Sequence, residues 1–213
     1  MNHPVMTSPK STSKFLLPPA AIHTTIIYQL IDIGTHEETN QKTGEKYPQR
    51  KIVVGLEFHG KNAPLIDNKP PVWHREVAYT MSAKGNLRKW ILAATGEAID
   101  DPYGDNYNIL TALGKPFTMQ LTAGKTASGN EKRDITSVMP LMDGVQAPIC
   151  FNPTSWLSLD PDHFNGNVFD NLPEWIKKKI TASPEFAVLT GAKPSQPAKA
   201  VAKVEGPNDE IPF

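Results

Sequence analysis

Basic and aromatic residues occur together at the starts of two alternating apolar segments, and basic residues gather again in a predicted helix and in one polar loop. Lysine and arginine side chains bind phosphates, and flat rings provide surfaces on which nucleobases stack. Each stacked base contributes roughly 1–3 kcal/mol to binding. The sequence therefore predicts a surface that binds a single strand of nucleic acid, with the candidate residues Tyr47, Arg50, Lys51, Trp73, His74, Arg75, Lys84, Arg88, Lys125, Lys132 and Arg133.

Some of these candidates have a second interpretation. Trp73 shares its parity with Val77 and Met81, so its ring faces either the core or a binding groove. If that side is the core, His74 faces the groove instead. The basic residues of the predicted helix, Lys84 and Arg88, either form a solvated face or contact phosphates.

Residue patterns typical of enzymes are absent. Gly124-Lys125-Thr126 lacks the earlier glycine of a phosphate-binding loop, because position 119 is Met119. The six histidines form no pair at metal-binding spacing, and a single cysteine, Cys150, excludes an internal disulfide and a multi-cysteine zinc site. We therefore expect no catalytic residue, no metal and no cofactor.

The elements that would position the candidates follow from hydrophobic periodicity. Strands are expected from Ile22 to about Gly34, over 50–59 and 73–81, and around 117–121 and 135–139. Apolar residues on both sides of the first strand indicate a bend or bulge. A helix over 82–95 that stops at Gly96 lies between the third and fourth strands. This order is that of the OB-fold, a five-stranded Greek-key barrel that binds oligonucleotides or oligosaccharides.

The residues beyond the barrel divide the chain further. We expect a flexible arm over 1–20, the OB-fold domain over 21–140, and an irregular and helical extension over 141–190 that packs on the barrel. Its expected contacts are Phe151, Trp156 and Phe164, and its helix begins at Pro173 with Trp175, Ile176 and Ile180 inward. Residues 191–207 have no aromatic side chain and are expected to be a flexible linker.

The linker carries an acidic tip over 208–213. A basic pocket with a hydrophobic slot would hold two carboxylates, an apolar side chain and the terminal carboxylate together. The candidate partner-binding residues are Asp209, Glu210, Ile211, Pro212 and Phe213. The tip resembles that of bacterial single-stranded-DNA-binding proteins, which use it to recruit replication and repair proteins. In that family the linker is usually rich in Gly and Gln and the acidic run is longer.

A second resemblance covers about 22–189. The phrases YTMSAKGNLRKWI, LGKPFTMQL, VMPL and LPEWIKKKITASPE resemble a family of phage-encoded OB-fold proteins regarded as single-stranded-DNA-binding replication proteins. The two resemblances imply a protein that coats single-stranded DNA without sequence preference in phage replication, recombination and repair. Its partners would be single-stranded DNA and replication or recombination proteins bound through the tip. The sequence leaves open whether the protein forms a homo-oligomer.

Charge and hydropathy agree with this expectation. The 22 basic and 22 acidic residues cancel, but basic residues are in excess over the first 140 positions and acidic residues over the rest. No apolar run is long enough to span a membrane, and the first residues lack the apolar core of a signal peptide. We expect a cytoplasmic protein, in the bacterial host if phage-encoded. The alternative is a phage structural or interaction module that binds no nucleic acid and uses the barrel as a scaffold.

Overall fold

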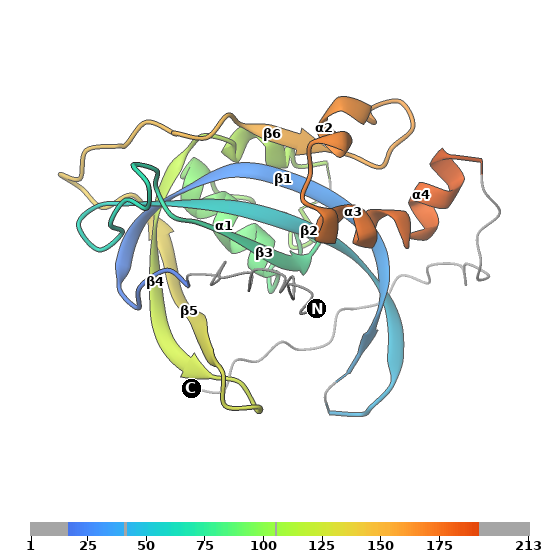
Figure 1. Cartoon of the computed structure of the whole chain (residues 1–213), viewed down its shortest axis with the longest axis horizontal. Helices are drawn as coiled ribbons and strands as arrows, with labels where there is room; N and C mark the ends of the chain where they lie inside the picture. Colours follow the sequence, from blue (N-terminus) through green and yellow to red (C-terminus); the bar gives the residue numbers. More distant parts are fainter. Residues whose placement is uncertain (1–16, 41, 105, 192–213) are drawn as a thin grey trace, which may run out of the picture.

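The structure is a computed structural model that describes residues 17–40, 42–104 and 106–191. Its fold is mainly β, with a six-stranded open sheet and a few short helices (Figure 1). The elements are β1 (Ile22–Thr39), β2 (Lys46–His59), β3 (Val72–Ala78), α1 (Asn86–Thr95), the 3-10 helix η1 (Ile109–Ala112), β4 (Pro116–Lys125), β5 (Glu131–Pro140), β6 (Ser155–Leu157), α2 (Gly166–Asp170), α3 (Glu174–Thr181) and α4 (Pro184–Leu189).

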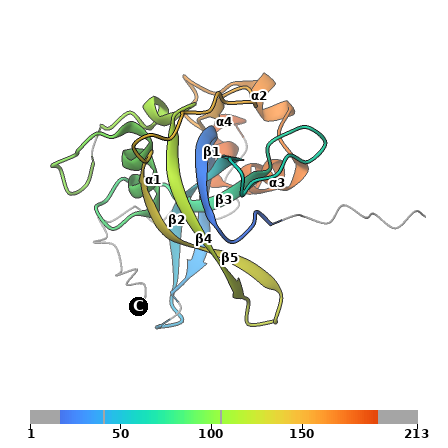
Figure 2. The same cartoon turned by 90° about the vertical axis from the view of Figure 1, so that its left-hand side faces the viewer.

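The sheet has the order β3-β2-β1-β4-β5, and its neighbouring strands are antiparallel. The short strand β6 pairs with β1 in parallel, at Gln29–Ile31. The expected sequence of three strands, a helix and two strands is confirmed, and the strongly curved strands make the sheet barrel-like (Figures 1 and 2). None of the helices in the described ranges combines the length and apolar character needed to cross a bilayer.

Strand β1 has two irregularities that let it serve two cores. Its register with β2 shifts between Ile27 and Gln29 and again between Asp32 and Gly34. These shifts confirm the bulge that apolar residues on both sides of the strand predicted. The strand does not end at Gly34 but continues to Thr39, because the hairpin with β2 extends to the Thr39 and Lys46 pair.

The first core lies between the sheet and α1. It contains the expected inward side of β2, namely Ile52, Val54, Leu56 and Phe58, together with Trp73, Trp90 and Phe117. Helix α1 ends as predicted, since Gly96 has a φ of 70° and its N–H donates to the Leu92 carbonyl. All seven of these core side chains are at most 4% exposed.

The second core covers the opposite face of β1 and β2. It is formed by Ile31, Ile33 and Val53 from the sheet and by Leu157, Leu159, Leu172, Ile176 and Ile180 from the segment beyond β5. The strict alternation of apolar residues in β2 predicts a single core face, and this prediction is wrong. Val53 and Glu57, on the other face, are fully buried because the C-terminal segment packs over them.

The extension over 141–190 packs on the sheet as expected, but through other side chains. Phe151 and Trp156 are 54% and 38% exposed, whereas Leu157 and Leu159 are buried. Phe164 is only partly buried, at the edge of the second core. Helix α3 follows Pro173 and buries Ile176 and Ile180, as the pattern predicted. Trp175 does not point inward, because it is 43% exposed.

Two long hairpins project from the same end of the sheet. The β1–β2 hairpin and the β4–β5 hairpin both extend beyond the body of the molecule in the same direction, in both views (Figures 1 and 2). Their strands stay paired almost to the tips, at Thr39–Lys46 and at Lys125–Glu131. The hairpins therefore form two prongs that carry several of the candidate basic residues.

Candidate nucleic-acid interface

The two prongs hold the most exposed of the candidate cations. Lys42 lies at the tip of the β1–β2 prong, Lys125 ends β4, and both are exposed. Among the described residues neither lysine side chain has an ion-pair partner, so both ammonium groups are available to an anion. Sequence reasoning did not single out Lys42, although its place in the polar loop between two strands is a usable signal.

Other cations on the prongs are paired with neighbouring carboxylates but stay accessible. Lys46 Nζ lies 2.6 Å from Glu37 Oε1, and Lys132 Nζ lies 2.8 Å from Asp134 Oδ1. The hydrogen bond that Lys46 donates to Glu37, together with the charge of Glu37, raises the pKa of Lys46. Because the side chains in both pairs are 45–66% exposed, a phosphate can replace the carboxylate at little cost.

Arg133 holds the N-terminal end of the described chain against β5. Its Nε donates to the Pro18 carbonyl at 2.7 Å, and one terminal nitrogen donates to the Lys132 carbonyl at 3.1 Å. Only 13% of its side chain is exposed. Arg133 thus positions the segment before β1, and only part of its guanidinium remains available for a phosphate.

Arg50 lies at the base of the β1–β2 prong. It forms an ion pair with Asp32, whose side chain is 3% exposed, with 2.5 Å between its terminal nitrogen and Asp32 Oδ2. Burial disfavours the charged guanidinium, but the hydrogen bond and charge of Asp32 outweigh it and raise the pKa of Arg50. The guanidinium also lies 5.6 Å from the centre of the Tyr79 ring. Tyr47, three residues before Arg50, is half-buried opposite Glu38.

Lys51 belongs to a chain of ion pairs on the other face of the sheet. Its Nζ contacts carboxylate oxygens of Glu38 and Glu76, and Glu76 also pairs with Lys179 of α3 at 2.6 Å. Only 13% of the Lys51 side chain is exposed. This lysine therefore helps to attach α3 to the sheet and is poorly placed to meet a phosphate.

The three candidates on β3 do not form an open stacking surface. Trp73 is 4% exposed and belongs to the first core. Of the two interpretations of its parity, the core interpretation is therefore the one observed. His74 is not open to a groove either, because Nε2 is bonded to the Tyr28 hydroxyl at 2.8 Å and the Trp175 ring packs edge-on against it. Burial lowers the pKa of His74, which keeps the ring neutral near pH 7.

Arg75 is the third candidate on β3. Its guanidinium carbon lies 4.6 Å from the centre of the Trp73 ring, and its buried Nε has no hydrogen-bond partner among the described residues. Burial lowers the pKa of Arg75, although the charge of Asp134 on β5 opposes this effect. A partly buried guanidinium without an acceptor favours an incoming anion.

The two candidates around α1 differ in exposure. Lys84 is exposed in the turn before the helix. Arg88 is 7% exposed, so its side chain neither lies on a solvated face nor is open to a phosphate. Its guanidinium donates to the backbone carbonyls of Met81, Ile99 and Asp101, at 3.0, 2.5 and 2.6 Å. Arg88 holds the loop after α1 in place.

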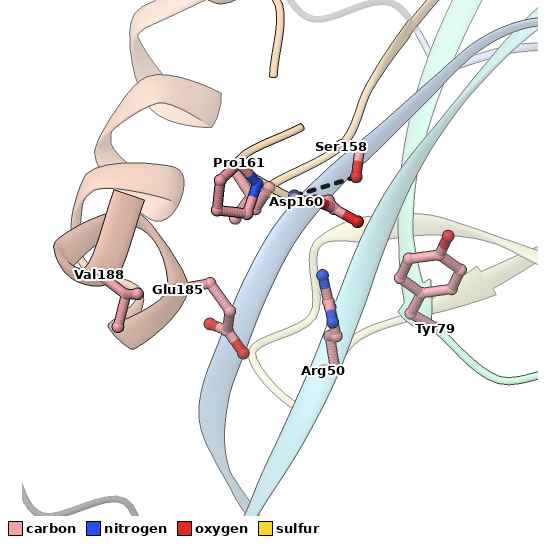
Figure 3. A pocket seen from close by; sticks show the side chains of 8 residues that line it. Arg50, Tyr79, Ser158, Asp160, Pro161, Glu185 and Val188 are labelled. Atoms are coloured by element: carbon pink, nitrogen blue, oxygen red, sulfur yellow. Dashed lines mark hydrogen bonds between the residues drawn. The ribbon is translucent and has the colours of Figure 1, made fainter. Parts of the chain in front are cut away.

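A cavity of about 700 Å³ opens beside Arg50 (Figure 3). Its lining includes Arg50, Tyr79, Asp160 and Glu185. Sequence reasoning missed this site, because Tyr79 shares the parity of core residues and Asp160 and Glu185 come from the C-terminal extension. Tyr79 is 37% exposed because β3 ends one residue before it.

Among the described residues no three His, Cys, Asp or Glu side chains gather in a way that would hold a metal ion. The predicted partner-binding residues Asp209, Glu210, Ile211, Pro212 and Phe213 lie outside the described residues, as do most of the predicted arm and linker. A comparison of the chain with protein-family models gives no match, and a comparison with curated proteins gives none either.

Proposed function

We propose that the chain is a single-stranded-DNA-binding protein without sequence preference, and that its curved sheet is an OB-type barrel. The order β3-β2-β1-β4-β5, with α1 between β3 and β4, supports the barrel assignment. In an OB-type barrel the loops joining strands 1 and 2 and strands 4 and 5 border the oligonucleotide site. These two loops are the tips of the prongs.

The observation that carries the proposal is the pair of prongs, because each of them carries exposed lysines. They project from one end of the sheet and bear the cations Lys42, Lys46, Lys125, Lys132 and Arg133. A single strand held between them would meet cations from both sides, and Tyr47 would offer a ring. Trp73 and His74 take no part in this interface, since both are covered.

The biological role follows from the resemblances in the sequence. The protein coats single-stranded intermediates of phage replication, recombination and repair in the host cytoplasm, and performs no catalysis. The acidic tip ending in Phe213 recruits replication and recombination proteins. Two carboxylates beside an apolar Ile-Pro-Phe segment support this role, because a basic pocket with a hydrophobic slot would hold both.

The test is a fluorescence-anisotropy titration of oligo(dT) and of duplex DNA over a range of salt concentrations. Each phosphate contact with a single strand contributes about 0.7 to the slope of log K against log salt. Five cations predict a slope of log K against log salt of about −3.5. Replacing Lys125 and Lys132 by alanine should weaken binding and reduce the slope by about 1.4.

The matched control is the pair Lys61→Ala and Lys69→Ala. Both lysines are exposed in the loop between β2 and β3, at the other end of β2 from the prongs. The control should bind as the wild type does. Equal affinity for oligo(dT) and duplex DNA, or equal losses in the two lysine pairs, would refute the proposed interface.

One observation favours a second candidate function, an interaction module that binds no nucleic acid. Lys51 and Arg50 are neutralised by carboxylates, and the cavity beside Arg50 is acidic. Such a protein would use the barrel as a scaffold for contacts with other proteins. Absence of any anisotropy change with oligo(dT) at low salt would select this candidate.

A further inference from the structure

A second cavity adjoins the one beside Arg50. The first has a volume of about 700 Å³ and the second of about 250 Å³, and Tyr79 and Ser158 line both. We call the two together the Tyr79 groove. It lies between the end of β3, the segment after β6 and the start of α4.

The first part of the groove is acidic. Arg50 is the only Lys or Arg among the described residues that line it, and Asp32 already pairs with Arg50. Two further carboxylates, Asp160 and Glu185, also line the cavity. Burial would raise the pKa of Glu185, but hydrogen bonds from Thr35 lower it, so the group is ionised at pH 7. One guanidinium therefore faces three carboxylates, which repels phosphate and attracts a cation.

The second part of the groove is apolar and aromatic. Its lining includes Leu30, Ile52, Tyr107, Ile109 and Trp156, and no carboxylate is among the lining residues that the structure describes. The Trp156 ring is 38% exposed, so an incoming side chain would cover apolar surface. The groove thus has the chemistry of a site for a peptide in which a basic residue adjoins an aromatic or aliphatic one.

The chain itself contains such a segment. Lys14 is followed directly by Phe15 and Leu16, and Leu17 is the first described residue. The adjacent Pro18 carbonyl accepts a hydrogen bond from Arg133 on β5, and the described chain begins on the side of the molecule away from α4 (Figures 1 and 2). The two residues from Leu17 to Phe15 span at most about 7 Å. The same segment of a neighbouring copy can approach the groove from outside and is not limited by this reach.

We propose that the Tyr79 groove binds the Lys14-Phe15-Leu16 segment of a second copy of this chain. The Lys14 ammonium would lie against Asp160 and Glu185, and the Phe15 ring would enter the apolar part beside Trp156. The segment of one copy and the groove of the next are different surfaces, so the contact is head-to-tail. Repeated contacts of this kind would join copies in a row. This inference requires no DNA and does not rest on the proposed function.

The experiment is sedimentation velocity of the full chain without DNA, over a concentration series, joined to anisotropy of a labelled peptide of residues 8–17. The wild type should assemble as its concentration rises and should bind the peptide. Phe15→Ala should weaken self-association by about tenfold or more, because it removes a large buried ring. Lys14→Glu and Asp160→Lys should each weaken it by about tenfold, because each places like charges together.

Combining Lys14→Glu with Asp160→Lys restores opposite charges and should recover most of the lost association. Asp162→Lys is the matched control, since Asp162 is exposed in the same loop but does not line the groove. Asp162→Lys should associate as the wild type does. Circular dichroism confirms that each variant is folded.

A wild type that stays monomeric at all concentrations, or a double variant that does not recover, would overturn the proposal. The same holds if Asp162→Lys weakens association as much as Asp160→Lys. Because DNA is absent, any of these results leaves the proposed DNA binding standing. Loss of oligo(dT) binding in the separate titration would in turn leave the groove proposal intact.

Discussion

Replacing Glu57 by glutamine tests what holds the segment after β5 on the sheet. The Glu57 side chain is fully buried and accepts hydrogen bonds from the backbone N–H groups of Phe151 and Asn152, both at 2.8 Å. Nδ2 of Asn152 also donates to it, and His59 Nε2 lies 2.6 Å away. Burial alone would raise the pKa of Glu57, but the hydrogen bonds from Phe151 and Asn152 outweigh burial and lower it.

The expected loss of stability is large because the substitution replaces one acceptor oxygen by a donor. Glutamine has the same size, but it has one acceptor oxygen and turns an NH₂ group toward a donor. A hydrogen bond to a charged group contributes about 1.5–3 kcal/mol, and a buried donor left unpaired costs about 1–3 kcal/mol. We therefore expect Glu57→Gln to lower the free energy of unfolding by about 3–5 kcal/mol.

Urea denaturation followed by circular dichroism measures this change. Glu131→Gln is the control, because the Glu131 side chain is 77% exposed, and it should change stability by less than about 0.5 kcal/mol. The pKa of Glu57 is lowered in the folded protein, so its contribution is present above the unfolded value of 4.5 and is lost as pH falls through the folded value. A Glu57→Gln variant within about 0.5 kcal/mol of the wild type at pH 7 would refute this account.

Three further predictions concern other parts of the fold. Arg88→Met should lower the free energy of unfolding by about 2–4 kcal/mol, since three backbone carbonyls lose their donor, and an unchanged urea midpoint would contradict it. Gly34→Ala should cost about 1–3 kcal/mol, because Gly34 has a φ of 79° and the new Cβ would lie 2.4 Å from Ser183 Cβ; thermal melting measures the loss. Burial raises the pKa of Tyr28 to about 12, so stability should fall as pH rises from 10 toward 12. The difference between the 295 nm titrations of wild type and Tyr28→Phe checks this value, and a difference centred near 10 would be inconsistent with a buried phenol.

The strands and α1 could be predicted because their signals are local. The alternation of Ile52, Val54, Leu56 and Phe58 predicts one buried face of β2, and Gly96 predicts the end of α1. The burial of Val53 and Glu57 on the other face could not be predicted. It depends on residues about a hundred positions later, and no local period carries that information.

The candidate interface was predicted in part for the same reason. Charged residues in polar loops, such as Lys125 and Lys132, are exposed where the sequence placed them. Arg88 is also basic and lies in a helix, yet its acceptors are carbonyls of a loop that only the folded chain brings near. Charge alone does not distinguish a basic side chain that faces solvent from one that donates to buried backbone carbonyls.

The two bulges of β1 restrict how this sequence can change in length. Ile27 and Leu30 face one core, and Ile31 and Ile33 face the other. Adding or removing one residue between Leu30 and Ile31 would turn Ile31 and Ile33 away from the second core, because successive residues of a strand point to opposite faces. Homologous proteins should therefore vary in this stretch by substitution and keep its length, whereas insertions should collect at the tips of the two prongs.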